Sequence, residues 1–500
     1  MNRLDDILIR YKRSATWWLA GIVFLLLSIL LRFAIDQPPV WDGAMSVYPA
    51  AIELSRTNFD FARLFSLPTF YEGGPNTHAT SPWTMLVAAL ISLTGSLASA
   101  LPILHTISFG LAALTVAATY RLIAHTAPGI VAVVGALAVL VFPPMLVQTA
   151  DVYLDLPLTC FGIWSLVMLV ERRFIAASAL VTMAVWIKPL AIIFAAVGAA
   201  FVFSQGDPQR RIRRTIVLAA PPLVVAAIVS LLQSASSVPP PLLDRYVVSI
   251  GGSSQWLGAM PDLIGLGIVT LLLIPAMIKS GVRQDTFTIM SLVLLSAVLL
   301  VLLNPLVSFG IPFIPRYYIA ILPAMIAGVL SFLSSKSRLL ALSAASALIV
   351  IFVVNLNGAL YPYKDHPTYA LAERSFAFRD LLALQIEDVG LLTELGQAMP
   401  VYYDYFGFYR LEYPELGYSK GPLESGISVF HNPELAGASL ENMPARFAFI
   451  YEYPVLGGEF LQRIWDEAKA SGAEVTETPL TRGTFTVYVV EVNQGGAVSP

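Results

Sequence analysis

A series of long apolar stretches through the first two thirds of the chain most constrains what this sequence can fold into. A helix that crosses a membrane needs about 20 apolar residues, and fewer where neighbouring helices shield it. Only 13% of the 500 residues are charged, whereas an average soluble protein has about a quarter. The sequence therefore predicts an α-helical polytopic membrane protein, with apolar windows at 16–35, 83–97, 101–123, 129–147, 156–171, 174–187, 190–204, 215–233, 262–279, 286–303, 317–333 and 339–356.

The positive charges predict which ends of these segments face the cytoplasm. Basic residues precede the first window, and basic groups lie between later ones, at Arg172-Arg173, Arg210–Arg214, Lys279 with Arg283, and Lys336 with Arg338. We therefore expect a cytoplasmic N-terminus, with the loops 36–82, 148–155, 234–261 and 304–316 on the opposite face. If Arg121 is cytoplasmic, one of the windows 83–97 and 101–123 does not span fully. The expected number of crossings is then about eleven.

The chain changes character after residue 356. Residues 357–500 carry 19 acidic and 9 basic residues, a net charge of −10, whereas the remainder has a net charge of +7. Aromatic and β-branched runs predict strands, and an apolar spacing followed by Gly472 predicts an amphipathic helix. We therefore expect a membrane domain over 1–356 and a soluble α/β domain over 357–500, outside the cell's inner (plasma) membrane, with strands at 401–405, 446–451 and 484–492 and a helix at 458–470.

Unusual polar residues gather in the loops predicted to face the outside. Asp42 follows the first apolar window, Asp155 precedes the fifth together with the less favoured Asp151, and Lys188 lies between the sixth and seventh. Arg316-Tyr317 opens the eleventh. A carboxylate can deprotonate an attacking hydroxyl, and Lys or Arg can hold a leaving phosphate. This arrangement suits a reaction between a lipid-borne phosphate donor and an acceptor in the aqueous phase.

Each of these residues also has a structural alternative. Asp42 and Asp155 suit helix N-caps, since Asp is a favoured capping residue. Lys188 and Arg316 could instead extend to the membrane interface. A divalent-metal site is an alternative for Glu72 and His78, although two ligands alone do not define one.

Two further stretches also leave alternatives open. The tyrosine-rich run from Tyr402 to Tyr413 suits either stacking on sugar rings or packing within a strand. The loop 234–261 suits a flap over a site or a plain connector.

Some classes of function are disfavoured. The single cysteine, Cys160, excludes an intramolecular disulfide and a cysteine-rich metal site. No glycine-rich nucleotide fingerprint occurs, which argues against an enzyme that binds a nucleotide sugar in a cytosolic domain. No nucleic-acid partner is expected, and no cofactor is predicted beyond the alternative of a divalent metal.

The layout resembles the GT-C-type membrane glycosyltransferases, and within them the protein O-mannosyltransferase and lipid A aminoarabinose transferase group. The resemblance covers about residues 10–356. It lies in Asp42 early in the first external loop, in Asp155-Leu-Pro157-Leu before an apolar helix, and in Arg316-Tyr317 followed by Pro323. Two features depart from that group: Gly43 stands where a second acid is common, and residues 72–82 do not reproduce the usual loop ending.

The resemblance implies a glycosyltransferase that moves a hexose or pentose from a polyprenyl-phosphate carrier to a glycan, lipid or protein acceptor, with inversion. It assigns Asp42 as general base and Asp155 as its assistant, with Lys188, Arg316 and Tyr317 on the donor phosphate. Glu72 and His78 would bind acceptor or metal. The alternatives are a flippase of lipid-linked sugars, a polysaccharide polymerase or ligase with a lipid-diphosphate donor, and a receptor or scaffold.

Overall fold

The computed structural model describes six stretches of the chain: 11–40, 43–64, 80–204, 208–234, 319–357, and 375–496 with short gaps at 404, 422, 424, 430–431, 433–434, 436–437, 452–457 and 484. Asp42, Glu72, His78, Arg316 and Tyr317 lie outside these stretches. So do the apolar windows 262–279 and 286–303, and the loop 234–261 beyond its first residue.

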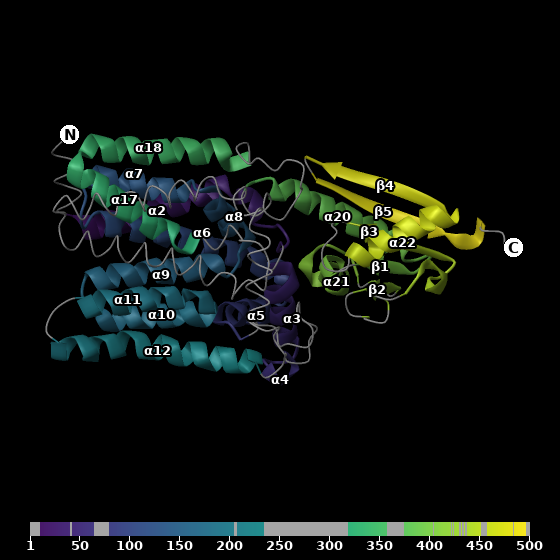
Figure 1. Cartoon of the computed structure of the whole chain (residues 1–500), viewed down its shortest axis with the longest axis horizontal. Coiled ribbons are helices and arrows are strands. Elements are labelled where there is room, and N and C mark those ends of the chain that lie inside the picture. Colours follow the sequence, from purple (N-terminus) through teal and green to yellow (C-terminus); the bar gives the residue numbers. More distant parts are fainter. Residues whose placement is uncertain are drawn as a thin grey trace.

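Long helices of the first two thirds form a bundle in which they lie side by side (Figure 1). Every apolar window within the described stretches corresponds to helical structure. These helices are α2 (Lys12–Leu30), α5 (Pro82–Thr94), α6 (Leu97–Ile123), α7 (Gly129–Leu140), α8 (Pro143–Asp151), α9 (Asp155–Val170), α10 (Phe174–Ile187), α11 (Ile192–Ser204), α12 (Pro208–Ser234), α17 (Leu322–Lys336) and α18 (Arg338–Val354).

Several helices carry apolar side chains on their outer faces. Trp18 and Ile29 of α2 are 74% and 73% exposed, and apolar residues of α12 and α18 are also exposed. Apolar surface of this extent marks contact with lipid or a partner. Within the described residues, four helices are long and apolar enough to cross a membrane, or five if the bent pair α7 and α8 forms one span. The chain is a membrane protein, and the predicted total of about eleven crossings stays a prediction.

The helix lengths distinguish the two windows between which the sequence could not decide. Helix α5 (Pro82–Thr94) has 13 residues, about 20 Å at 1.5 Å per residue, whereas the 27 residues of α6 extend about 40 Å. Ser81 caps the start of α5, and Gly95 ends it in the left-handed conformation at a φ of 81°. Of this pair, only α6 is long enough to cross a bilayer by itself.

Breaks in the helices lie at prolines near the end of the bundle that adjoins the C-terminal residues. Pro143 and Pro144 begin α8 (Pro143–Asp151), which is bent by 58° from α7. Pro189 begins the short 3₁₀ helix η3 (Pro189–Ala191) between α10 and α11. Because proline has no N–H and clashes with the preceding turn, it ends or kinks a helix at such points.

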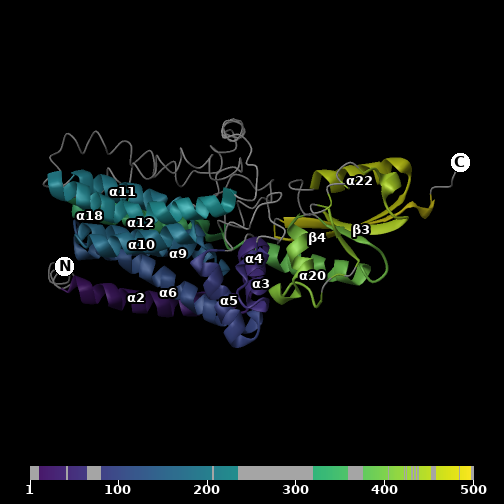
Figure 2. The same cartoon turned by 90° about the horizontal axis from the view of Figure 1, so that it is seen from below.

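Short helices of residues 43–64 lie between the bundle and the C-terminal residues (Figure 2). They are the π-helical turn η2 (Gly43–Val47), α3 (Tyr48–Arg56) and α4 (Phe61–Leu64), and α3 packs on α5. Residues 48–54 of α3 are all buried, including Glu53. This layer therefore belongs to the interior of the protein.

Residues 375–496, called here the C-terminal unit, contain a five-stranded mixed sheet in the order β2-β1-β3-β5-β4. Strand β1 pairs in parallel with β2 and β3, and β5 pairs antiparallel with β3 and β4. The elements are α20 (Phe378–Leu395), β1 (Val401–Tyr403), α21 (Tyr405–Glu412), η6 (Pro414–Leu416), β2 (Gly426–Ser428), η8 (Leu440–Asn442), β3 (Arg446–Tyr451), α22 (Gly458–Ser471), β4 (Glu474–Arg482), β5 (Phe485–Asn493) and η9 (Gln494–Gly496).

The two faces of this sheet are covered by different helices. One face packs with Phe460, Leu461 and Ile464 of α22, in a separate small core. The other face, with α20, belongs to the same continuous hydrophobic core as the membrane helices. The position of Gly472 after α22, at a φ of 78°, confirms the predicted helix end.

The predicted strand Val401–Tyr405 was too long, because α21 begins at Tyr405. The predicted strand at 446–451 is confirmed as β3, and that at 484–492 corresponds to β5.

The tyrosine-rich run lies in the protein interior. Four of its side chains are buried and present no surface for stacking on a sugar: Tyr402, Tyr403, Tyr409 and Tyr413.

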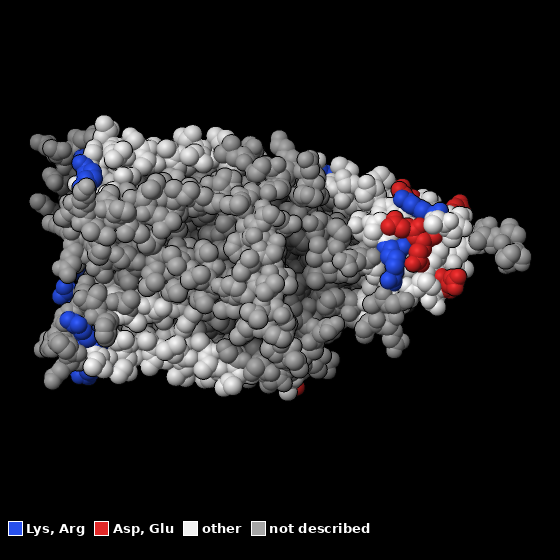
Figure 3. All heavy atoms as spheres, in the orientation of Figure 1, with Lys and Arg blue, Asp and Glu red and all other residues white. Residues whose placement is uncertain are grey.

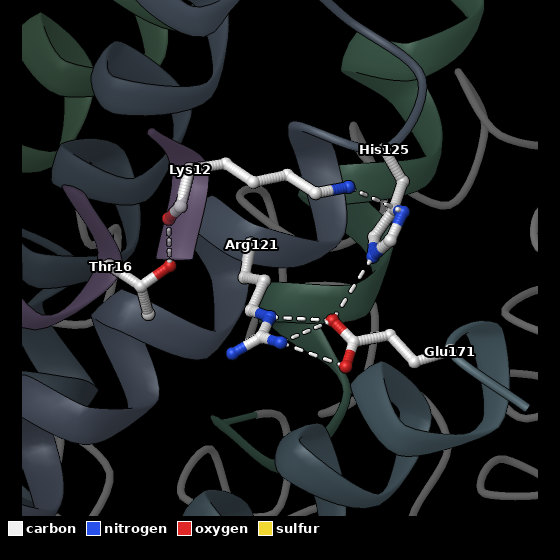
Figure 4. A network of polar contacts seen from close by, with 5 residues as sticks. All are labelled: Lys12, Thr16, Arg121, His125 and Glu171. Atoms are coloured by element: carbon white, nitrogen blue, oxygen red, sulfur yellow. Dashed lines mark hydrogen bonds and ion pairs between the residues drawn. The ribbon is translucent and has the colours of Figure 1, made fainter. Parts of the chain in front are cut away.

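Basic side chains gather at the end of the bundle farthest from the C-terminal unit (Figure 3). At this end a polar network joins α2, α6 and α9 (Figure 4). Arg121 donates through Nε and a terminal nitrogen to the two carboxylate oxygens of Glu171, at 2.6 and 2.8 Å. His125 Nε2 lies 3.6 Å from Glu171, and Lys12 Nζ lies 3.4 Å from His125 Nδ1.

Aromatic rings extend the same network. The guanidinium of Arg121 lies over the ring of Trp164 at 5.8 Å, and Trp164 stacks on Trp17 of α2 with ring centroids 5.9 Å apart. The Arg121 and Glu171 side chains are only 7% and 12% exposed. A buried charge pair of this kind is costly to break from one side, because the remaining charge is left without compensation.

We therefore predict that Glu171→Gln destabilises the protein by about 3 kcal/mol. The measurement is thermal unfolding in detergent. Arg173→Gln, which changes an exposed charge two residues away, is the matched control and should have little effect. Equal melting temperatures for the two variants would show that the Arg121–Glu171 pair does not hold these helices together.

His125 adds a dependence on pH. Burial lowers the pKa of His125 below its ordinary value of 6.5, Lys12 and Arg121 lower it further, and Glu171 acts in the opposite direction. A lowered pKa in the folded state means that the unfolded chain takes up a proton first. Stability is therefore fully present above pH 6.5 and declines as the pH falls below it.

We expect the melting temperature of the wild type to fall more steeply between about pH 7.5 and 5.5 than that of His125→Gln. Parallel curves for the two proteins over this range would contradict the assignment to His125.

Candidate active site

An ion pair between Asp155 and Lys188 is buried at the end of the bundle that faces the C-terminal unit. Lys188 Nζ lies 2.8 Å from Asp155 Oδ1, and the two side chains are 7% and 2% exposed. Asp155 is the first residue of α9, and Lys188 directly follows α10. The structure thus brings together two of the residues that the sequence had singled out, which are 33 positions apart.

The local sequence fixes where each charge emerges. The residue before a proline is driven out of the helical region, and Lys188, before Pro189, has an extended conformation with φ −153° and ψ 124°. Its carbonyl accepts a hydrogen bond from the N–H of Ala191. Asp155 begins α9, and Pro157 lies in the first turn, where the missing N–H of proline breaks no hydrogen bond within the helix.

The surroundings of Lys188 are arranged for a cation. Besides the carboxylate of Asp155, the ring of Tyr153 lies 5.7 Å from Lys188 Nζ. A charged side chain in an apolar setting is expensive unless such partners compensate it. The alternative that Lys188 extends to the membrane interface is therefore wrong, because its ammonium is held inside the protein.

The capping alternative for Asp155 also fails. Leu154 occupies the position before α9, no side chain caps the helix, and the Asp155 carboxylate is directed to Lys188. Asp151, the last residue of α8, is buried four residues before the start of α9. The capping alternative for Asp42 stays a prediction, because Asp42 lies outside the described stretches.

The short loop between α8 and α9 is strained and is held by α3. Val152 has a φ of 54°, in the left-handed region that a β-branched residue rarely adopts, at a cost of about 1–3 kcal/mol. The hydroxyl of Tyr48 in α3 donates to the Val152 carbonyl at 3.3 Å. Burial and the nearby Asp151 raise the pKa of Tyr48, which keeps this hydroxyl protonated as a donor.

The later end of the loop 36–82 is tied to the same region. The indole Nε1 of Trp186, two residues before Lys188, donates to the Thr80 carbonyl at 3.1 Å. Thr80 precedes Ser81, whose hydroxyl accepts from the N–H of Trp83 at the start of α5. The loop 36–82 is therefore tied to the neighbourhood of the Asp155–Lys188 pair at two points, Tyr48 and Thr80.

Three side chains near this region escaped the sequence analysis. Tyr48, Tyr418 and His105 are all buried, and Tyr48 and Tyr418 each donate a hydrogen bond to a segment remote in sequence. The only available signal was local: Tyr48-Pro49 follows soon after Asp42, and a histidine interrupts an apolar helix.

The described residues offer no group of three or more His, Cys, Asp or Glu side chains that could hold a metal ion. Glu72 and His78 lie outside the region to which this applies, so the metal alternative stays a prediction.

No protein-family model and no curated protein matches the sequence. Solved structures do show a likeness. ArnT from Cupriavidus metallidurans in the apo state has a TM-score of 0.45 and 14% identity, covering 95% of this chain and 98% of that chain. The same protein bound to undecaprenyl phosphate has a TM-score of 0.41 and 14% identity, covering 97% and 100%.

The archaeal oligosaccharyltransferase AglB from Archaeoglobus fulgidus, in complex with an inhibitory peptide and a dolichol-phosphate, has a TM-score of 0.45 and 12% identity. The alignment covers 98% of this chain and 75% of that chain.

The buried pair makes a direct prediction about stability. Asp155→Asn and Lys188→Met each leave one charge buried without its partner, and each should destabilise the protein by about 3–5 kcal/mol. The double variant should recover much of that loss, since no uncompensated charge remains. Thermal unfolding of the four proteins forms a double-mutant cycle. If the two single losses simply add in the double variant, the side chains do not interact.

Proposed function

We propose that this chain is a membrane glycosyltransferase that moves one sugar from a polyprenyl-phosphate carrier to a glycan, lipid or protein acceptor. The observation that carries the proposal is the Lys188 ammonium, held at the end of two apolar helices by Asp155 and Tyr153. A cation fixed at the end of a membrane helix suits the phosphate of a lipid whose tail lies in the bilayer. In this role Lys188 binds the donor phosphate, and Asp155 orients Lys188.

Asp42 is the proposed general base. It lies in the sequence between Val40 and Gly43, whose backbone groups are joined by a hydrogen bond of 3.1 Å from the Gly43 N–H to the Val40 carbonyl. The turn η2 that follows is π-helical, a conformation frequent at functional sites. Arg316 and Tyr317 are the further proposed contacts to the phosphate, and Glu72 and His78 remain proposed contacts to acceptor or metal.

The proposed reaction is a direct displacement. The acceptor hydroxyl oxygen attacks the anomeric carbon while its proton passes to the Asp42 carboxylate. The bond from the anomeric carbon to the phosphate oxygen breaks, and the electron pair leaves with the polyprenyl phosphate. Lys188 and Arg316 stabilise the charge on that leaving group. A single displacement inverts the anomeric centre, whether the sugar is a hexose or a pentose.

The proposed orientation follows from the charges. Because cytoplasmic loops of membrane proteins are enriched in Lys and Arg, the basic end of the bundle is assigned to the cytoplasm. The Asp155–Lys188 end and the C-terminal unit then lie on the outer face of the inner membrane, where the acceptor would be met. The C-terminal unit is then the soluble α/β domain that the sequence predicts outside the membrane.

A flippase of lipid-linked sugars is the main alternative. Such a transporter needs polar groups midway through its helices, whereas the Lys, Arg, Asp and Glu side chains of the described bundle helices lie near helix ends. A polymerase or ligase would use a lipid-diphosphate donor, for which a pair of arginines would be expected. The placement of charges therefore favours the transferase.

The test is sugar transfer by the purified protein from a defined pool of polyprenyl-phosphate sugars. Asp42→Asn should lower the rate by about 10²–10⁴-fold, because it removes the base and keeps the size of the side chain. Asp36→Asn, at an exposed carboxylate of the same loop, is the matched control and should retain transfer. Thermal unfolding of both variants establishes that they fold.

Near-normal transfer by Asp42→Asn would exclude it as the base and make Asp155 the next candidate. A wild type that binds the donor lipid and transfers nothing, but moves it across a vesicle membrane, would favour the flippase.

A further inference from the structure

The C-terminal unit touches the first external loop on both sides of residues 41–42. On the earlier side, the buried hydroxyl of Tyr418 donates to the carbonyl of Pro39 at 2.9 Å, although the two residues are 379 positions apart. Gly417, with a φ of 90°, lies beside Pro38, where an added Cβ would be in ordinary contact with the proline Cγ at 3.6 Å. The backbone here needs glycine, since a φ of this sign strains any other residue.

On the later side, α21 of the C-terminal unit packs directly on the turn η2. Helix α3 continues from that turn, and its last residue, Arg56, bridges two carboxylates. One is Glu53 in the same helix, at 2.8 Å, and the other is Glu415 of the C-terminal unit. The Arg56 guanidinium also lies 5.9 Å from the centre of the Tyr413 ring.

These contacts form one connected set. Tyr418, Glu415 and Tyr413 lie within six consecutive residues around η6, and η6 itself packs on α6. The ring of Tyr418 is in turn faced by Arg410 of α21 at 5.9 Å. One short segment of the C-terminal unit therefore contacts Pro39, which precedes residues 41–42, and α3, which follows them.

We propose that the C-terminal unit acts as a positioning element for the transfer reaction, and that Tyr418 is the residue through which it acts. This rests on the proposed function, with Asp42 as base. The segments 38–40 and 43–47 bound Asp42 in the sequence, and both contact the C-terminal unit. Tyr418 fixes the first, α21 fixes the second, and Tyr48 connects the second to the loop before Asp155.

A buried hydrogen bond to a backbone carbonyl is suited to this role. It orients the chain without touching substrate, so its loss should affect the rate of the chemical step more than binding of the donor. Misplacement of a reacting group by about 1 Å is enough to lower a rate about 100-fold. Loss of one hydroxyl from a segment that keeps its other contacts should cost less.

The test compares Tyr418→Phe with Tyr488→Phe and with the wild type. Tyr488 lies in β5 beside α22, away from the junction, and serves as the matched control. We expect Tyr418→Phe to lower kcat about 10-fold, equivalent to about 1.4 kcal/mol, while KM for the donor stays within about twofold. Its melting temperature should stay close to that of the control.

A second readout does not depend on activity. Amide hydrogen exchange of peptides that cover residues 37–47, which include the Gly43 N–H bonded to the Val40 carbonyl, should be faster in Tyr418→Phe than in both other proteins. Glu415→Gln, which weakens the bridge to Arg56, should accelerate exchange in peptides that cover residues 48–56. Unchanged exchange in Tyr418→Phe would overturn the proposal whatever the activity.

The remaining outcomes are also decisive. Faster exchange with an unchanged kcat would show that the contact holds the loop without serving the reaction, which overturns the positioning role. A rise in KM with constant kcat would assign Tyr418 to donor binding instead. Absence of transfer by the wild type would overturn the proposed function and the catalytic half of this inference, while exchange would still decide whether the C-terminal unit holds the loop.

Discussion

The arrangement of the bundle at the end that faces the C-terminal unit depends on one interaction, the ion pair of Asp155 and Lys188. Each charge would be prohibitively expensive alone at 2–7% exposure, so α9 and α10 must meet at the level where one begins and the other ends. The break at Pro189 and the loop 152–154 lie at that level, next to the two charges. The strained Val152 is held because Tyr48 and α9 determine the conformation on either side of it.

A second constraint is the continuity of the hydrophobic core. One face of the sheet in the C-terminal unit, together with α20, shares its core with the membrane helices, whereas the other face has a small core of its own with α22. The Phe33 ring meets Phe376 edge to face, and the Arg379 guanidinium lies 4.3 Å from the centre of the Phe33 ring. The C-terminal unit is therefore joined to the bundle by apolar packing as well as by polar contacts.

Much of the helical part could be predicted from the sequence because hydropathy is a local property. The windows 156–171 and 174–187 lie within one residue of α9 and α10 at each end. Helix α5 could not be separated from a spanning helix in this way, since its 13 residues are as apolar as its neighbours and only its length sets it apart. In the C-terminal unit, β3 was evident from its aromatic residues, but β4, with mostly exposed side chains, gave no alternating pattern.

The candidate site was predictable in its residues and not in its contacts. A lysine between two apolar helices and an aspartate before a third are visible in the sequence, yet nothing local indicates that they meet. The same holds for Tyr48 with Val152 and for Tyr418 with Pro39, which are 104 and 379 positions apart. Such pairs depend on how the helices and the C-terminal unit pack. Tyr48 and Tyr418 donate to backbone carbonyls, and every residue type carries such a carbonyl. The sequence therefore holds no signal for the acceptor, and only the folded structure reveals these positioning contacts.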